Sequence, residues 1–102
     1  MGTFVKVAKA SEIPALTGKL VEAGGKQLAL FQVEGTFYAL DNNCTHRGGP
    51  LSEGEVQGLE VQCPWHGAHF HLATGQATQA PAFQGVTSYP VRLQGEDIEV
   101  EV

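Results

Sequence analysis

The stretch "CPWHGAHFH", residues 63–71, places one cysteine and three histidines within nine positions. The chain holds only one other cysteine, Cys44, and one other histidine, His46. Every cysteine and histidine of the 102 residues therefore lies between positions 44 and 71. Because thiolates and imidazoles are ligands of iron, zinc and copper, this segment is the candidate metal centre.

Four of these side chains follow the pattern C-x-H-x16-C-x2-H. Cys44 and His46 form one close pair, and Cys63 and His66 form the second. Two close pairs separated by a long excursion indicate two loops that meet, because each short spacing lets one turn aim two side chains at a common point. The pattern thus predicts one site with four ligands.

Three interpretations of these four residues are open. Buried packing thiols and structural histidines are the ordinary fate of a lone cysteine or histidine, and two matched pairs disfavour that interpretation. Tetrahedral zinc accepts two cysteines and two histidines, but its usual spacing places like ligands together. The alternating order seen here allows both cysteines to bind one iron and both histidines to bind a second.

Strand patterns flank this segment on both sides. Alternating hydrophobicity predicts strands at residues 3–8, 19–23, 27–33, 36–42, 86–93 and 97–102, with short ones at 59–62 and 68–72. The second, third and fourth form a meander, and Pro90 indicates that one late strand lies at a sheet edge. We expect one all-β domain, residues 1–102. The strands near the ends of the chain should pair back onto the sheet that contains the meander. A glycine- and proline-rich region at about 42–83 interrupts the domain.

The charge of the chain bears on its partners. The formal net charge is −5, and its six Lys and Arg residues are scattered, which disfavours a nucleic-acid partner and favours a basic patch on a protein. No stretch reaches membrane-spanning length, and the N-terminal segment lacks the apolar core of a signal peptide. We therefore expect a soluble, cytoplasmic protein that binds neither nucleic acid nor membrane.

The segments "CTHRGGPLSEG" (44–54) and "CPWHG" (63–67) resemble the two cluster-binding loops of the Rieske [2Fe-2S] proteins. The similarity covers the whole chain. It implies an antiparallel β-sandwich with a smaller cluster-binding subdomain, about residues 42–83, and one [2Fe-2S] cluster per chain. By motif position, Cys44 and Cys63 bind the buried iron, and His46 and His66 bind the outer iron. "QAPAF" around Pro81 matches a third loop that covers the cluster in that family.

Departures from the high-potential members of the family predict a low reduction potential. Two imidazoles make the oxidised cluster neutral instead of doubly negative, which places Rieske potentials at roughly −150 to +300 mV. In cytochrome bc complexes a disulfide joins the two loops, whereas Gly49 and Trp65 stand there in this chain. Ala68 and Phe70 replace a serine and a tyrosine whose hydroxyls donate hydrogen bonds toward cluster sulfur. Without these donors the potential should fall toward the bottom of the range.

Four further side chains have open roles. His69 and His71 alternate around Phe70, so they share one strand face, and we expect surface or hydrogen-bonding roles; the alternative is that His69 displaces His66 as a ligand. Trp65 is either a packing residue in place of the disulfide or part of a docking surface. Arg47 should lie near the exposed tip, where it either meets an acceptor protein or is an ordinary solvated arginine.

The resemblance implies a soluble Rieske-type ferredoxin, which carries one electron and has no substrate chemistry of its own. Such a protein passes electrons from a flavin-containing, NAD(P)H-dependent reductase to a terminal oxygenase of aromatic or related compounds. One alternative is a Rieske-like small subunit of a nitrite reductase or another large oxidoreductase. Others are a zinc-stabilised interaction module and a detached N-terminal domain of an oxygenase.

Overall fold

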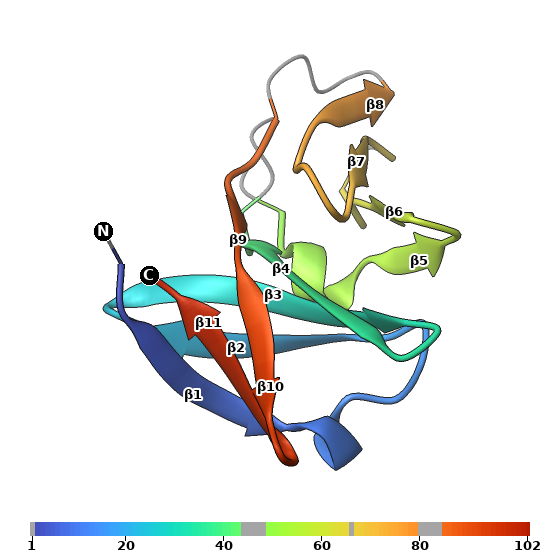
Figure 1. The fold of residues 1–102 in the computed structure, drawn as a ribbon. Coiled ribbons are helices and arrows are strands. Elements are labelled where there is room, and N and C mark those ends of the chain that lie inside the picture. Colours follow the sequence, from blue (N-terminus) through green and yellow to red (C-terminus); the bar gives the residue numbers. More distant parts are fainter. Residues whose placement is uncertain (1, 44–48, 66, 80–84) are drawn as a thin grey trace.

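The computed structural model describes residues 2–43, 49–65, 67–79 and 85–102. Across these residues the chain forms eleven strands in three antiparallel sheets, together with two short 3-10 helices (Figure 1). The elements are β1 (Phe4–Lys9), η1 (Ala10–Glu12), β2 (Gly18–Ala23), β3 (Lys26–Val33), β4 (Thr36–Asp41), η2 (Leu51–Glu53), β5 (Glu55–Gln57), β6 (Glu60–Gln62), β7 (His69–His71), β8 (Ala77–Gln79), β9 (Ser88–Tyr89), β10 (Val91–Gln94) and β11 (Asp97–Glu101). The predicted all-β class is confirmed.

The three sheets have simple orders. The first is β1-β11-β10, the second is β2-β3-β4-β9, and the third is β5-β6-β7-β8. In Figure 1 the first sheet lies against the meander of the second, and the third sheet stands apart above them. The second sheet therefore lies between the other two.

Strand β3 explains this layering, because it is buried on both faces. Leu28 and Leu30 pack into one hydrophobic core with Ile98 of β11. The alternate residues, Ala29 and Phe31, pack into the other core, which also contains residues of β6 and β7. Neighbouring side chains of a strand point to opposite faces. The apolar residues of β3 therefore pack against the first sheet on one face and against the third sheet on the other.

Most strand predictions agree with the structure. The meander of β2, β3 and β4 is confirmed, as is the edge position indicated by Pro90: β9 and β10, on either side of it, are edge strands of different sheets. The expectation that the chain ends return to the meander is wrong for β10 and β11. They pair with β1 in a separate sheet, and β9 alone joins β4.

Strands β5 and β8 escaped prediction from the sequence. Each is three residues long, which is too short for a repeating pattern to stand out. Both lie in the region at about 42–83 that was expected to form a subdomain, and the bounds of that subdomain stay a prediction. In the part of the chain that the structure describes, neither helix has the length or apolarity to cross a membrane.

Candidate metal centre

Of the four predicted ligands, only Cys63 belongs to the described residues. Cys44, His46 and His66 lie outside them, as do Arg47 and Pro81. Within the described ranges, no group of three or more His, Cys, Asp or Glu side chains is arranged to hold a metal ion. The ligand set therefore stays a prediction. The structure does show the residues that flank the two predicted cluster-binding loops and hold their ends in place.

The first loop is closed at its base. An isolated β-bridge pairs Asn43 with Pro50, and the N–H of Leu51 donates to the Asn42 carbonyl over 2.7 Å. The buried Asn42 side chain adds a second bond, because its Oδ1 accepts the N–H of Ser52 over 2.9 Å. Asn43 and Pro50, which flank residues 44–49 in the sequence, are thus paired beside η2.

The second loop is closed in the same way. Strands β6 and β7 pair Gln62 with His69, and the Cys63 N–H donates to the Ala68 carbonyl over 2.7 Å. Cys63 is 1% exposed and belongs to the hydrophobic core beneath the third sheet. The second predicted thiolate is therefore held rigidly by a hairpin.

Gly49 brings the two loops together. A Cβ built on Gly49 would lie 2.8 Å from Cys63 Sγ, so the backbone of the first loop runs directly past the sulfur of the second. This is a space that any side chain at position 49 would fill. A buried thiol with loop backbone close against it suits a ligand of an iron–sulfur cluster, and the described residues fit that cofactor.

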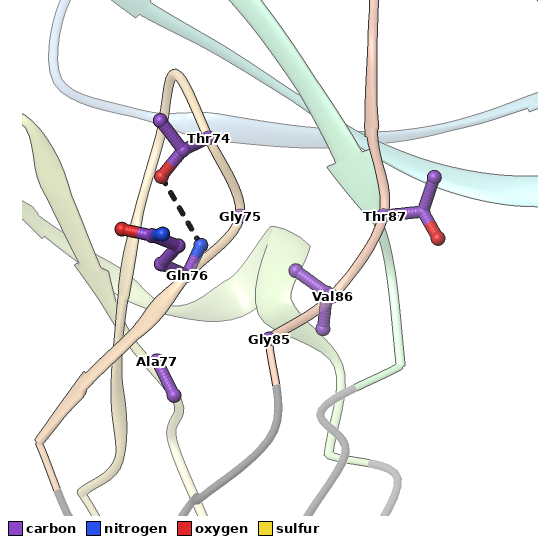
Figure 2. Close-up of a pocket in the computed structure, with 7 residues that line it drawn as sticks. All are labelled: Thr74, Gly75, Gln76, Ala77, Gly85, Val86 and Thr87. Atoms are coloured by element: carbon purple, nitrogen blue, oxygen red, sulfur yellow. Dashed lines mark hydrogen bonds between the residues drawn. The ribbon is translucent and has the colours of Figure 1, made fainter.

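The segment that follows the predicted third loop is also held in place, although Pro81 itself lies outside the described residues. Gly85 approaches the turn between β7 and β8 so closely that a Cβ on it would lie 2.5 Å from the Gly75 carbonyl oxygen. The Val86 N–H donates to that same oxygen over 2.8 Å. A groove of about 460 Å³ lies between these two segments. Figure 2 shows the residues that line it, among them Thr74, whose Oγ1 accepts the N–H of Gln76.

A second groove, of about 330 Å³, reaches Cys63. Glu53 and Glu55 line it together with Cys63. Arg47 is the only Lys or Arg in the sequence between positions 27 and 91. Negative charge near a centre opposes the addition of an electron, so we expect these carboxylates to lower the reduction potential.

The two extra histidines face the third sheet's polar side, as predicted. His69 Nδ1 lies 3.3 Å from Glu60 Oε1, and His71 Nδ1 accepts the N–H of Ala73 over 3.2 Å. Phe70, between them, is fully buried. The predicted hydrogen-bonding roles are confirmed for both histidines.

The residues that replace the disulfide and the hydroxyl donors differ in exposure. Ala68 and Phe70 are fully buried, whereas Trp65 is 49% exposed. The base of the Trp65 side chain packs on Gly49, which supports the predicted packing role, while its role in docking stays a prediction. The absence of hydroxyls at positions 68 and 70 leaves the core side of the loop apolar.

Comparison with known families decides the class of protein. The family model for the Rieske [2Fe-2S] domain matches residues 3–90. The chain belongs to the Rieske [2Fe-2S] family. The predicted cofactor of this Rieske protein, a [2Fe-2S] cluster, is thereby confirmed.

Relatives of this Rieske protein are similar over nearly their whole length. It is 41% identical over 91 residues to the ferredoxin component of the naphthalene 1,2-dioxygenase system of Pseudomonas aeruginosa, covering 89% of this chain and 88% of the relative. The ferredoxin of carbazole 1,9a-dioxygenase from Nocardioides aromaticivorans has a TM-score of 0.92 at 28% identity, with 96% of each chain covered.

A third similar structure shows a ferredoxin with a partner. It is a complex of reduced oxygenase and oxidised ferredoxin in carbazole 1,9a-dioxygenase, and the match has a TM-score of 0.91 at 30% identity. The match covers 99% of this chain and 94% of that one. The predicted antiparallel Rieske fold is confirmed by these comparisons.

Sequence reasoning missed two residues that shape the site. Asn42 closes the base of the first loop, and Gly75 accepts a hydrogen bond from Val86, which follows the predicted third loop in the sequence. A polar pair after a strand and a glycine within "ATGQA" are both common turn signals, so neither stood out. Their roles follow only from which segments the fold brings together.

Proposed function

We propose that this chain is a ferredoxin that carries single electrons from a flavin-containing, NAD(P)H-dependent reductase to a terminal oxygenase of an aromatic compound. The observation that carries this proposal is the near full-length similarity to ferredoxin components of dioxygenase systems, at 41% identity for the naphthalene system. The chain has no catalytic residue of its own in this proposal. A cytoplasmic location suits such an exchange with soluble partners.

The ligands proposed are Cys44 and Cys63 for one iron, and His46 and His66 for the other. When bound, a [2Fe-2S] cluster with two imidazole ligands takes up and releases one electron near the potentials of flavins and oxygenases. Cys63 supplies a buried sulfur held by its hairpin, and Gly49, at the end of the first loop, lies directly against that sulfur.

Charge favours a basic docking patch on each partner. Eleven acidic residues outnumber six basic ones, and Glu53 and Glu55 line the groove that reaches Cys63. Opposite charge on the partner would steer the encounter and speed association at low ionic strength. The rate of electron transfer should therefore fall as salt is added.

Ligand substitution tests the site. Replacing Cys44, His46, Cys63 or His66 singly by alanine should abolish the Rieske EPR signal of the reduced protein, whose low average g value distinguishes it from all-cysteine clusters. His69→Ala and His71→Ala are the matched controls and should keep it. A native signal in His66→Ala, with loss in His69→Ala, would make His69 the ligand instead.

Turnover tests the function. With the reductase and terminal oxygenase of its source organism, the wild-type protein should support NAD(P)H-dependent product formation, and Cys63→Ala should not. Equal rates with the two proteins would contradict the carrier role. Stoichiometric co-purification with one large oxidoreductase subunit would favour the small-subunit alternative.

A further inference from the structure

Gly49 and Trp65 meet at the seam between the two loops. A Cβ built on Gly49 would lie 3.0 Å from Trp65 Cγ and 3.1 Å from Trp65 Cβ, in addition to 2.8 Å from Cys63 Sγ. Packed atoms in protein interiors leave no slack for an extra carbon at such distances. The loops can approach this closely only because position 49 has no side chain.

The requirement at Gly49 is for space and not for backbone conformation. Its φ lies outside the left-handed region, which separates it from the glycines of the turns, such as Gly35 with φ +81°. Alanine could therefore adopt the same backbone. What alanine could not do is avoid the Cys63 sulfur and the root of the Trp65 side chain.

Trp65 supplies the bulk that Gly49 lacks. The first two carbons of its side chain pack on Gly49, and about half of the residue faces solvent. Each loop is closed at its own base, by the Asn43–Pro50 bridge and by the Cys63–Ala68 hydrogen bond. Among the described residues, Gly54 and the pairing of β5 with β6 join the first loop to the strand before Cys63, and the contact of Gly49 with Trp65 and Cys63 adds a direct contact between the two loops.

We propose that Gly49 and Trp65 form a noncovalent clamp that holds the first loop against Cys63 and limits the access of water to its sulfur. The clamp rests on the proposed ligand role of Cys63. Gly49 and Trp65 act as positioning residues. Because Gly49 has no side chain, the first carbons of the Trp65 side chain can pack directly on its backbone, and this packing resists separation of the two loops. The clamp should therefore govern how long the cluster is retained.

Truncation of Trp65 is the first test. In the loaded protein exposed to a chelator, Trp65→Ala should lose visible absorbance about ten-fold faster than wild type, equivalent to ~1.4 kcal/mol. Trp65→Phe, which keeps the first side-chain carbons and a ring, should restore most of the lifetime. Leu59→Ala is the matched control, because Leu59 is 45% exposed in the same sheet region. Equal loss in Trp65→Ala and Leu59→Ala would overturn the clamp.

A side chain at position 49 is the second test. Gly49→Ala should shift the EPR g values and the reduction potential, because its Cβ presses on Cys63 Sγ, whereas Gly35→Ala should leave both unchanged because open space surrounds Gly35. An unchanged spectrum for Gly49→Ala would contradict the proposed contact.

A covalent replacement keeps the proposal testable if Gly49→Ala binds no cluster. Disulfides need Cβ atoms roughly 3.5–4.5 Å apart, so the 3.1 Å separation requires only a small adjustment. Gly49→Cys with Trp65→Cys should form an intramolecular disulfide, seen as a 2 Da mass loss that a reductant reverses and located by peptide mapping at positions 49 and 65, not at Cys44 or Cys63. Free thiols at both position 49 and position 65 after mild oxidation would refute the juxtaposition.

The clamp and the ligand set can fail separately. If Cys63→Ser kept a native Rieske signal, the ligand assignment would be wrong, and the double-cysteine variant would still report whether the loops touch. If Cys63→Ser lost the cluster and the double variant stayed reduced, the assignment would stand and the clamp would be wrong.

Discussion

The Tyr89 hydroxyl donates a hydrogen bond to Asp41 Oδ1 over 2.7 Å, joining β9 to the end of β4 just before the first loop. Burial, followed by this hydrogen bond and by the charge of Asp41, raises the pKa of Tyr89 to about 12 from its ordinary 10.0. The contact links the strand that returns from the third loop to the strand that enters the first.

Tyr89→Phe should lower the free energy of unfolding by about 1 kcal/mol at pH 8, because one partly buried hydrogen bond is lost. Since the folded pKa lies above the unfolded value, the stabilisation from the neutral phenol is complete below pH 10 and is lost as the pH rises through about 12. Denaturant unfolding from pH 8 to 11.5 should show the gap between the two proteins closing. A constant gap would contradict the linkage.

Ala68→Ser should raise the reduction potential of the loaded protein by on the order of 50 mV. A hydroxyl placed beside Cys63 can donate toward sulfur, and a hydrogen bond of about 1 kcal/mol that favours the reduced form corresponds to that shift for one electron. Spectroelectrochemical titration measures it. Ala77→Ser, in the neighbouring strand β8, is the control and should leave the potential unchanged.

The wild-type potential itself should lie in the lower half of the Rieske range, roughly −150 to +75 mV. Ala68 and Phe70 offer no hydroxyl, and Glu53 and Glu55 line the groove at Cys63. A midpoint in the upper half of the range, measured by redox titration, would contradict the prediction.

Gly75→Ala should lower the free energy of unfolding by at least about 2 kcal/mol. Its φ is +77°, which costs an L residue roughly 1–2 kcal/mol, and a Cβ there would also run into the Val86 carbonyl oxygen. Gly35→Ala has a similar φ of +81° with nothing within 4 Å, so it isolates the backbone cost. Equal losses in the two variants would mean that the approach of Val86 contributes nothing.

Asn42→Ala should destabilise the protein by about 1–3 kcal/mol, because it leaves the Ser52 N–H without its partner in a buried place. The looser base of the first loop should also hasten cluster loss. Asn43→Ala is the control: Asn43 is exposed, and its bridge to Pro50 uses backbone atoms. Visible absorbance and thermal unfolding give the two readouts, and equal behaviour of both variants would contradict the role of Asn42.

The sequence alone determined the class of protein, because that information is local. The spacing of cysteines and histidines around Cys63 is specific to Rieske loops, and alternation in strands such as Lys26–Val33 predicts a sheet from neighbouring residues alone. The prediction of a low potential also rests on single positions, such as Ala68 and Phe70.

Tertiary structure decided which distant segments meet. Strand β1 pairs with β11, Val86 donates a hydrogen bond to Gly75, and Gly49 lies against Cys63 and Trp65. The residues in these contacts are 11 to 97 positions apart in the sequence. No local pattern encodes them, since a glycine that admits a neighbouring loop looks the same in sequence as a glycine that turns the chain. The ligand motif could thus be read directly, while the clamp around it became visible only when packing brought the two loops together.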